Sequence, residues 1–340
     1  MNHILTRTSR ARLIGSVALI AVMAIVGFQG YSAASLASFV AASALLAISL
    51  DLAWGYTGIL SLGHGLFFGI AAYSTALAAQ AGIDSFALLS LIAIGSGALA
   101  ALIVGVLMFS GRSDIPLIYV AMATLALSFV AERVASSWSF IGSDTGMAGL
   151  VPPRLFGLDT LDPYVYLAIC LVTLLVIVII TIIMTASGWG HVLVGIRENE
   201  LRMKFSGFRT SRVKVQVFTI SGGIAGLGGF LYAFNLGVAS PTALGVNQST
   251  LAVIWVLAGG VGTLVGPVAG AVAISYLSEQ LSAVSAGWWE IVLGVILIVI
   301  LIVFRKGMVG IAQLLWGLVF GRRSSARDER PDSTQRGDES

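Results

Sequence analysis

The stretch YVYLAICLVTLLVIVIITIIMT, from Tyr164 to Thr185, decides the fold. It contains no charged side chain, and a helix needs roughly 20 mostly apolar residues to cross the hydrocarbon core of a bilayer. The stretch therefore predicts a membrane-spanning helix. Composition extends this prediction to the rest of the chain, because 57% of its 340 residues are hydrophobic and only 10% are charged, with a mean hydropathy of +0.97.

Ten apolar runs follow one another along the chain and predict an all-α, polytopic transmembrane bundle of about ten helices. They are Leu13–Gln29, Ser35–Ala53, Ile59–Ala79, Phe86–Ser110, Ile115–Val134, Tyr164–Thr185, Val215–Ala233, Ser249–Leu264, Val268–Gln280 and Trp288–Phe304. Between the eighth and ninth runs, GGVGTLVGPVAG (Gly259–Gly270) predicts either a broken helix or a short re-entrant hairpin. We expect residues 1–320 to form a single transmembrane domain and the polar tail, 321–340, to be disordered.

The charges predict the orientation of the chain. With ten spans and both termini on one side, only Arg133 and Arg154 of the 19 Lys and Arg residues fall on the opposite side. Because basic residues concentrate on the cytoplasmic side, both termini are expected in the cytoplasm. The basic opening and first apolar run also resemble a signal peptide, but the length of that run favours a retained first span.

The longest loop on the basic side, Gly188–Lys214, reads GWGHVLVGIRENELRMKFSGFRTSRVK and predicts a short helix at its centre. Glu198 and Glu200 lie near the start of this helix, Arg202 near its end and Gly207 just beyond, as the helix dipole and the usual glycine stop favour. The apolar residues that could anchor it are Ile196, Met203 and Phe205. An amphipathic helix laid in a partner's groove is a common recognition mode, and the equal alternative is a solvated basic loop that serves only topology.

A second unusual segment, Asp51–Gly69, interrupts the apolar pattern with glycines, hydroxyls and a histidine. Such groups are tolerated at membrane depth where they are buried in protein or line a watery cavity, and ionisable ones mark pathways. The candidate pathway residues in the two interruptions are Gly55, Tyr56, Ser61, His64, Gly65, Gly259, Gly260 and Gly262. A structural role is the alternative for each: His64 as a hydrogen-bonding partner of a neighbouring helix, and glycine pairs such as Gly222 and Gly226 as packing faces.

Several functional classes find no support in the sequence. It contains no GxxxxGK[ST] phosphate loop and no HExxH motif, and His3, His64 and His191 lie far apart, so neither nucleotide hydrolysis nor a metal site is predicted. Acidic and basic residues are sparse within the spans and lie near their ends, which disfavours a proton or sodium relay. The energy for transport would then come from a partner.

Three segments together resemble the permease subunits of ATP-binding-cassette importers for branched-chain amino acids, and their relatives for urea and short amides. They are WGYTGILSLGHGLFFGIAAY, then GIRENELRMKFSGF followed by KVQVFTISGGIAGLGGFLYA, and LAGGVGTLVGPVAGA. The resemblance runs from about Ser35 to Gly310. This chain departs from the family pattern where it has Asp51 for an expected asparagine, and also at His191, Gly195 and Arg305.

The resemblance implies a non-catalytic subunit that translocates leucine, isoleucine and valine delivered by an extracytoplasmic binding protein. It implies a paralogous permease as the other half of a heterodimeric pore in the inner membrane of a bacterium, and two cytoplasmic ATPase subunits that bind the ATP. In that picture the segment Arg197–Gly207 docks on the ATPase. Neither a cofactor of its own nor a nucleic acid partner is implied. A urea or short-amide permease is the alternative, ahead of an ATP-independent secondary transporter and a membrane-embedded enzyme.

Overall fold

The computed structural model describes residues 7–111, 116–154, 160–284 and 294, and these are mostly helical. The helices are α1 (Arg7–Gly27), α2 (Tyr31–Thr57), α3 (Gly65–Gln80), α4 (Phe86–Phe109), α5 (Leu117–Ser137), α6 (Pro163–Ala186), α7 (Gly188–Glu198), α8 (Glu200–Phe205), α9 (Thr210–Leu236), α10 (Val246–Gly259) and α11 (Val265–Val284). Three 3-10 turns, η1 (Ser139–Ile141), η2 (Ser143–Thr145) and η3 (Pro241–Leu244), and two short strands, β1 (Met147–Ala148) and β2 (Val238–Ala239), complete the described elements.

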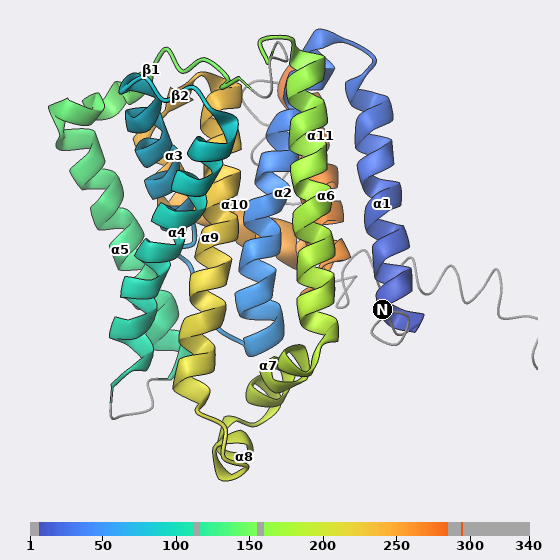
Figure 1. Ribbon diagram of the computed structural model, residues 1–340, viewed down its shortest axis with the longest axis vertical. Coiled ribbons are helices and arrows are strands. Elements are labelled where there is room, and N and C mark those ends of the chain that lie inside the picture. The colour runs from blue at the N-terminus through green and yellow to red at the C-terminus, as the bar shows by residue number, and fades with distance from the viewer. Residues whose placement is uncertain (1–6, 112–115, 155–159, 285–293, 295–340) are drawn as a thin grey trace, which may run out of the picture.

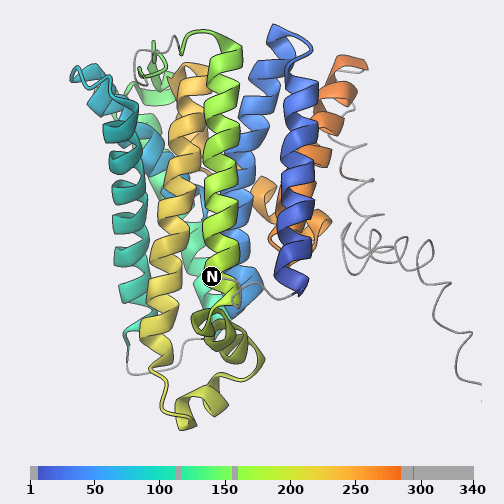
Figure 2. The ribbon, with the colours of Figure 1, turned by 45° about the vertical axis from the view of Figure 1, so that its right-hand side comes forward.

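The long helices run side by side along one axis (Figure 1). Strands β1 and β2 pair antiparallel, with Met147 opposite Ala239, and lie at one end of the bundle. Helices α7 and α8 lie at the other end, where α1 also begins; we call this the α8 end. Figure 2 places α1 and α11 at one side of the bundle and α4 at the other.

Two helices, α2 and α9, form the centre of the bundle. In their most apolar stretches, 78% of α2 and 83% of α9 is buried, against 22% of α5. Helix α9 packs most extensively on α4, α2 and α3. Its glycines allow this close approach, since a Cβ on Gly226 would overlap the carbonyl of Ala93, and one on Gly222 would overlap the side chain of Ala101. The predicted packing face of Gly222 and Gly226 is confirmed.

Five described helices are long and apolar enough to cross a membrane: α2, α4, α5, α6 and α9. Shorter apolar helices cover Arg12–Gly27, Gly65–Gln80 and Val246–Gly259. The predicted tenth span, Trp288–Phe304, and the tail 321–340 lie outside the described residues. The count of ten spans, the single domain over 1–320 and the cytoplasmic termini therefore stay predictions.

The segment around GGVGTLVG is a helical hairpin, which decides between the two alternatives. A Cβ on Gly259 would overlap Gly266, and one on Gly270 would overlap the carbonyl of Trp255, so α10 and α11 pack antiparallel. The predicted eighth helix was extended too far, because α10 ends at Gly259. Within the linker, residues 260–264, the φ angles of Gly260, Gly262 and Leu264 are +116°, +80° and +62°. Positive φ cannot continue a right-handed helix.

Other predicted boundaries need correction. The third helix begins at Gly65 rather than Ile59, because residues 58–64 form turns between α2 and α3. The predicted short helix near Arg197–Gly207 is two helices, with Glu198 ending α7 and Glu200 beginning α8. Asn199 separates them in an extended conformation, and its side chain accepts a hydrogen bond from the backbone N–H of Arg202 at 2.9 Å. Asparagine is among the preferred N-cap residues, so it begins a new helix here.

The predicted glycine stop after α8 is confirmed. Gly207 has a φ of +86°, and its N–H donates to the carbonyl of Lys204 at 3.0 Å. The N–H of Phe208 reaches back to the carbonyl of Met203 at 3.1 Å. This pair of bonds is the Schellman arrangement, in which a left-handed glycine ends a helix.

Candidate functional site

Three segments that are far apart in the sequence meet near the C-terminal end of α2. Asp51 and Gly55 lie on α2, Gly262 lies in the linker between α10 and α11, and Arg197 lies in the last turn of α7. We call these four residues the helix-end junction. The sequence analysis singled out these segments separately, as two glycine-rich interruptions and a basic loop. The structure brings the three segments into contact.

Asp51 is the central group of this junction and is fully buried. One carboxylate oxygen accepts from the N–H of Gly262 at 2.6 Å, and the other accepts from the N–H of Leu264 at 3.0 Å. Successive N–H groups in a segment that alternates handedness form a cradle for an anion. The carboxylate of Asp51 fills such a cradle, so the negative charge inside the fold has hydrogen-bond donors on both oxygens.

Two arginines approach the same region. The guanidinium of Arg197 donates a hydrogen bond to the backbone carbonyl of Gly55. Its Nη1 also lies 3.2 Å from the point that a Cβ on Gly262 would occupy, so it borders the linker as well as α2. At the adjacent position of α2, the hydroxyl of Tyr56 accepts a hydrogen bond from Arg12 of α1 at 3.0 Å. Positive groups thus surround the end of α2, where helix carbonyls are least satisfied.

Glycine at position 55 is what lets the linker lie against α2. A Cβ there would sit 2.6 Å from the N of Gly262 and would also overlap the carboxylate of Asp51. These atoms belong to the hydrogen bond that holds the linker. Any larger residue at position 55 would push the linker away from α2.

His64 and Gly65 lie elsewhere and contact α9 and α10. His64 is fully buried at the start of α3, and its Nε2 pairs with the hydroxyl of Ser221 at 2.9 Å. The same hydroxyl donates to the carbonyl of Ser49 at 2.6 Å. We call Ser49, His64 and Ser221 the histidine cluster. It supports the structural reading of His64, as a hydrogen-bonding partner of a neighbouring helix.

Aromatic rings enclose the histidine cluster. The imidazole stands edge-on to Phe67 and Phe218, with ring centroids 5.4 and 6.2 Å away. Nearby in the chain, Gly65 donates its N–H to the hydroxyl of Ser249 on α10 at 2.9 Å. Within the described part of the chain, the Nδ1 of His64 and the hydroxyl of Ser61 are buried without a protein hydrogen-bond partner.

The structure therefore divides the predicted pathway residues into two groups. Gly55, Tyr56 and Gly262, with Gly260 in the linker and Gly259 at its edge, belong to the helix-end junction or border it. His64 and Gly65 form or border the histidine cluster, and Ser61 is buried in the connection between α2 and α3 that precedes them.

In the predicted coupling segment, Glu200 faces inward. Its carboxylate accepts from Lys214 at 2.6 Å and from the hydroxyl of Thr210 at 3.0 Å, both on α9. Lys214 is buried and lies over the ring of Phe109, 5.8 Å from its centroid. Glu200 thus fastens α8 to α9, as Arg197 fastens α7 to α2.

The opposite face of this segment is open. Leu201, Phe205 and Phe208 are 61%, 90% and 43% exposed and follow one another at spacings of four and three residues. This spacing places them on one side of α8 and the residues just after it; we call them the α8 face. The predicted coupling residues Arg197, Glu198 and Arg202 are also exposed, Arg197 despite its bond to α2. Of the three predicted anchors, Phe205 is free to contact a partner, whereas Ile196 is buried and Met203 packs on Gly195.

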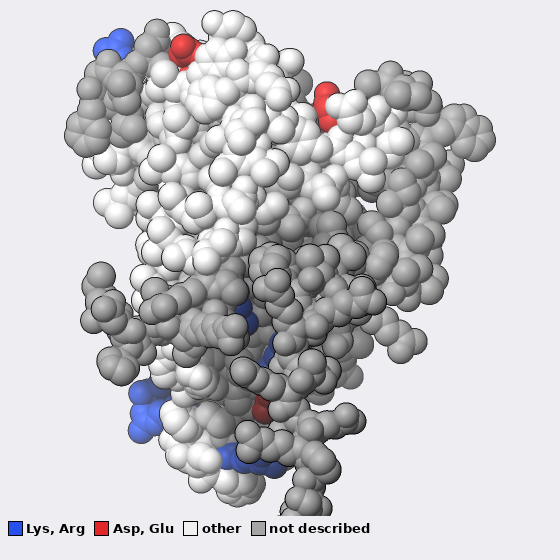
Figure 3. Space-filling model, turned by 90° about the vertical axis from the view of Figure 1, so that its right-hand side faces the viewer, with Lys and Arg blue, Asp and Glu red and all other residues white. Residues whose placement is uncertain are grey.

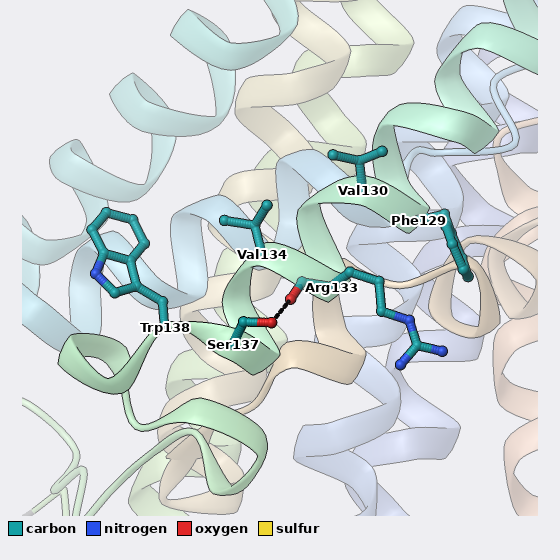
Figure 4. A pocket seen from close by; sticks show the side chains of 6 residues that line it. All are labelled: Phe129, Val130, Arg133, Val134, Ser137 and Trp138. Carbon is teal, nitrogen blue, oxygen red and sulfur yellow. Dashed lines mark hydrogen bonds between the residues drawn. The ribbon is translucent and has the colours of Figure 1, made fainter.

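A pocket of about 490 Å³ lies away from both groups, on the outer face of α5 (Figure 4). Phe129, Val130, Val134 and Trp138 line it, and the guanidinium of Arg133 lies 5.3 Å from the centroid of Phe129. None of the predicted pathway residues lines this pocket. Elsewhere, the described residues contain no group of three His, Cys, Asp or Glu side chains placed to hold a metal ion.

Sequence reasoning missed the residues that complete these groups. Asp51 was noted only as an acid near a predicted helix end and as a departure from a family pattern. Its position inside an otherwise apolar span was the available signal, because a buried carboxylate requires donors. For Ser221 and Ser249 the sequence offered no such signal, since serine is common in membrane helices that pack closely.

Comparisons with known proteins fit this architecture. Residues 32–301 match the family model described as "Branched-chain amino acid transport system / permease component". The high-affinity branched-chain amino acid transport system permease protein LivM of Salmonella typhimurium is 27% identical over 245 residues, which cover 64% of this chain and 56% of LivM. The LivM protein of Escherichia coli is 26% identical over the same length. The match thus spans little more than half the length of these relatives.

Permeases for other solutes also match, over shorter stretches. The autoinducer 2 import system permease protein LsrC of Salmonella typhi is 24% identical over 196 residues, covering 55% of this chain and 54% of LsrC. The ribose import permease protein RbsC of Escherichia coli is 29% identical over 124 residues, covering 34% of this chain and 39% of RbsC. No solved structure gives a significant match.

Proposed function

The chain belongs to the family of branched-chain amino acid transport system permease components, and from this we propose that it is the membrane permease subunit of an ATP-driven importer for leucine, isoleucine and valine. The observation that carries the proposal is the family match over residues 32–301, which includes both the helix-end junction and the α8 face. The apolar helices and the permease relatives describe a multi-pass membrane protein.

The energy for transport is proposed to come from ATPase subunits bound at the α8 end. Lys and Arg gather at this end of the molecule, below a broad surface without charge (Figure 3). Because basic residues favour the cytoplasmic side, we place the α8 end in the cytoplasm of a bacterial cell, facing the ATPases. The chain itself contains no GxxxxGK[ST] phosphate loop for ATP.

The surface proposed to dock on the ATPase is the α8 face. Leu201, Phe205 and Phe208 are large apolar side chains exposed on a short helical segment that projects from the bundle (Figure 1). An apolar helical face of this kind fits a groove on a partner. Exposed Glu198 and Arg202 would flank it. Arg197 and Glu200, in contrast, are proposed to transmit force within the chain, since their charged groups bind α2 and α9.

The remaining partners follow from the family. We propose a second, paralogous permease as the other half of the pore and an extracytoplasmic binding protein that delivers the solute. The substrate proposal rests on the LivM relatives, which match over a longer stretch than the others. A second candidate, a sugar-like solute, is supported by the LsrC and RbsC matches.

The test is uptake by proteoliposomes that contain the complex purified from its native membrane through a tag on this chain, together with the binding protein of the same system. Labelled leucine, ribose and urea are supplied outside, with and without ATP at the ATPase side. We expect leucine uptake that requires ATP. Uptake of ribose or urea instead would change the substrate, and uptake by this chain alone, insensitive to ATP, would overturn the importer proposal.

The docking surface is tested by Phe205→Ala in the same assay. We expect it to weaken ATPase binding during purification and to lower uptake roughly tenfold, because central aromatic anchors carry much of the affinity of an interface. The matched control is Phe140→Ala, which removes an exposed aromatic ring far from the α8 face, at the end with β1 and β2. Equal ATPase recovery with both variants would rule out the α8 face as the docking surface.

A further inference from the structure

The linker between α10 and α11 is held in a conformation that it would not adopt by itself. Leu264 has a φ of +62°, a region that is unfavourable for a non-glycine residue unless the surroundings hold it there. The hydroxyl of Thr263 bonds within the linker, and the hold from outside it is the carboxylate of Asp51, which accepts from the N–H groups of Gly262 and Leu264. The conformation of the linker therefore depends on α2.

Arg197 connects the linker and the C-terminal end of α2 to α7, at the α8 end of the molecule. It stands in the last turn of α7, one residue before the Glu198–Asn199–Glu200 turn into α8. Its guanidinium donates to the carbonyl of Gly55 and borders Gly262. A planar guanidinium has several donors in a rigid arrangement, so one side chain can contact α2 and the linker together.

The second attachment of the α7–α8 segment reaches a different helix. Glu200 binds Lys214 and Thr210 at the start of α9, which packs on α4, α2 and α3. Arg197 thus attaches α7 to α2 and to the linker between α10 and α11, whereas Glu200 attaches α8 directly to α9. A movement of α7 and α8 would reach the hairpin through Arg197 and the helix-end junction.

We propose that Arg197 and Asp51 are positioning residues that join α7, the end of α2 and the linker 260–264 into one unit, so that movement of the α8 face is transmitted to the α10–α11 hairpin. This inference rests on the proposed function, in which a partner moves the α8 face. A coupled change requires that the two states differ in interaction free energy. The bonds to Gly55, Gly262 and Leu264 are the contacts that would carry that difference.

The experiment compares Arg197→Ala with Arg212→Ala in the purified complex. Arg212 is an exposed arginine at the start of α9, at the same end of the molecule, so its loss removes the same charge without touching the junction. Uptake and ATP hydrolysis are measured on the same proteoliposomes. We expect Arg197→Ala to lower the solute imported per ATP by roughly 5- to 150-fold, the usual range for coupling between sites, while ATP hydrolysis continues. Arg212→Ala should keep the wild-type ratio.

A second readout follows the linker directly by hydrogen exchange of the peptide that covers residues 260–264. In the wild-type complex, trapping the ATPase with a nucleotide analogue should change this exchange, and Arg197→Ala should abolish the response. Asp51→Asn keeps the side-chain shape but replaces one accepting oxygen by a donor. It should speed exchange of the same peptide, because one of the two N–H groups loses its acceptor.

The outcomes separate this inference from the proposed function. A wild-type complex without ATP-dependent uptake would overturn the proposed function itself. If the wild type imports solute but Arg197→Ala keeps the ratio of solute to ATP, import stands and the transmission through Arg197 is wrong. A fall of uptake and hydrolysis in equal proportion would give Arg197 a merely structural role, and a linker that does not respond to nucleotide in the wild type would overturn the inference as well.

Discussion

The helix-end junction and the histidine cluster are both buried polar groups on α2, and they are built differently. At the junction, both carboxylate oxygens of Asp51 accept backbone hydrogen bonds, and Arg197 stands beside them. In the histidine cluster, His64 has one partner on Nε2, and its other nitrogen has none in the described part of the chain. Burying a charge costs far more than burying a neutral polar group, so only the charge requires a full set of donors.

This difference predicts which site tolerates change. The junction depends on a charge and on close backbone contact between segments far apart in the chain. The histidine cluster depends mainly on ring packing of His64 with Phe67 and Phe218, and its hydrogen bonds are fewer. Substitutions at the junction should therefore cost more stability than comparable ones at the cluster.

The largest effect is expected for Asp51→Ala. It would leave the N–H groups of Gly262 and Leu264 without acceptors; the donor of Leu264 is buried, and a buried orphan donor costs about 1–3 kcal/mol. We expect a marked fall in the melting temperature of the purified protein in detergent, followed by circular dichroism. Asp51→Asn, which keeps one acceptor, should lose clearly less. Equal losses would mean that the carboxylate does not hold the linker.

Gly55→Ala should have the next largest effect, a loss of about 1–3 kcal/mol from overpacking. The added methyl would lie 2.6 Å from the N of Gly262, against backbone that cannot move aside as a flexible side chain would. Gly95→Ala on α4 is the control, because a Cβ there meets nothing within 4 Å. The control should be neutral or stabilising, since alanine favours helix over glycine by about 1 kcal/mol. Similar melting of the two variants would argue against a tight contact at Gly55.

A smaller loss, about 1 kcal/mol, is expected for Ser221→Ala, which removes the hydroxyl that bonds His64 and the carbonyl of Ser49. The measurement is again thermal melting, with Ser90→Ala as a control on α4, a half-buried serine that bonds only the carbonyl of Phe86 in its own helix. A loss as large as that of Asp51→Ala would show that the histidine cluster depends on its hydrogen bonds as strongly as the junction depends on its charge.

The smallest effect is expected for Ser61→Ala. Its buried hydroxyl has no protein partner in the described residues, so replacing it by a methyl group should be neutral or slightly stabilising. A destabilisation above about 1 kcal/mol would instead indicate that a bound water satisfies Ser61, as waters commonly satisfy buried polar groups. Thermal melting distinguishes a dry environment of Ser61 from a hydrated one.

Local features of the structure were largely predictable. The predicted span Phe86–Ser110 became α4, and Tyr164–Thr185 became α6, each within a residue at either end. The glycine stop at Gly207 was also predictable. In each case the deciding interactions lie within a few residues along the chain, where hydrophobic runs and capping residues can be seen.

The helix-end junction was not predictable in the same way. Asp51 binds Gly262 and Leu264, and Arg197 binds Gly55, across separations of more than a hundred residues. The sequence marked Gly55, Gly262 and Arg197 as unusual but assigned Arg197 and Glu200 to a partner surface. In the structure both charged groups bind neighbouring helices, Arg197 while it stays exposed as a residue, and Phe205 is left outside.

Apolar length, charge and capping are local properties, so the amino-acid sequence was enough to predict a bundle of apolar helices with two glycine-rich interruptions and a basic, partly helical loop. That the second interruption is a hairpin, that it lies against α2, and that Asp51 and Arg197 join it to α7 became known from the folded chain. These features could not be predicted because a buried carboxylate is satisfied by whichever backbone donors the packing of distant helices brings to it.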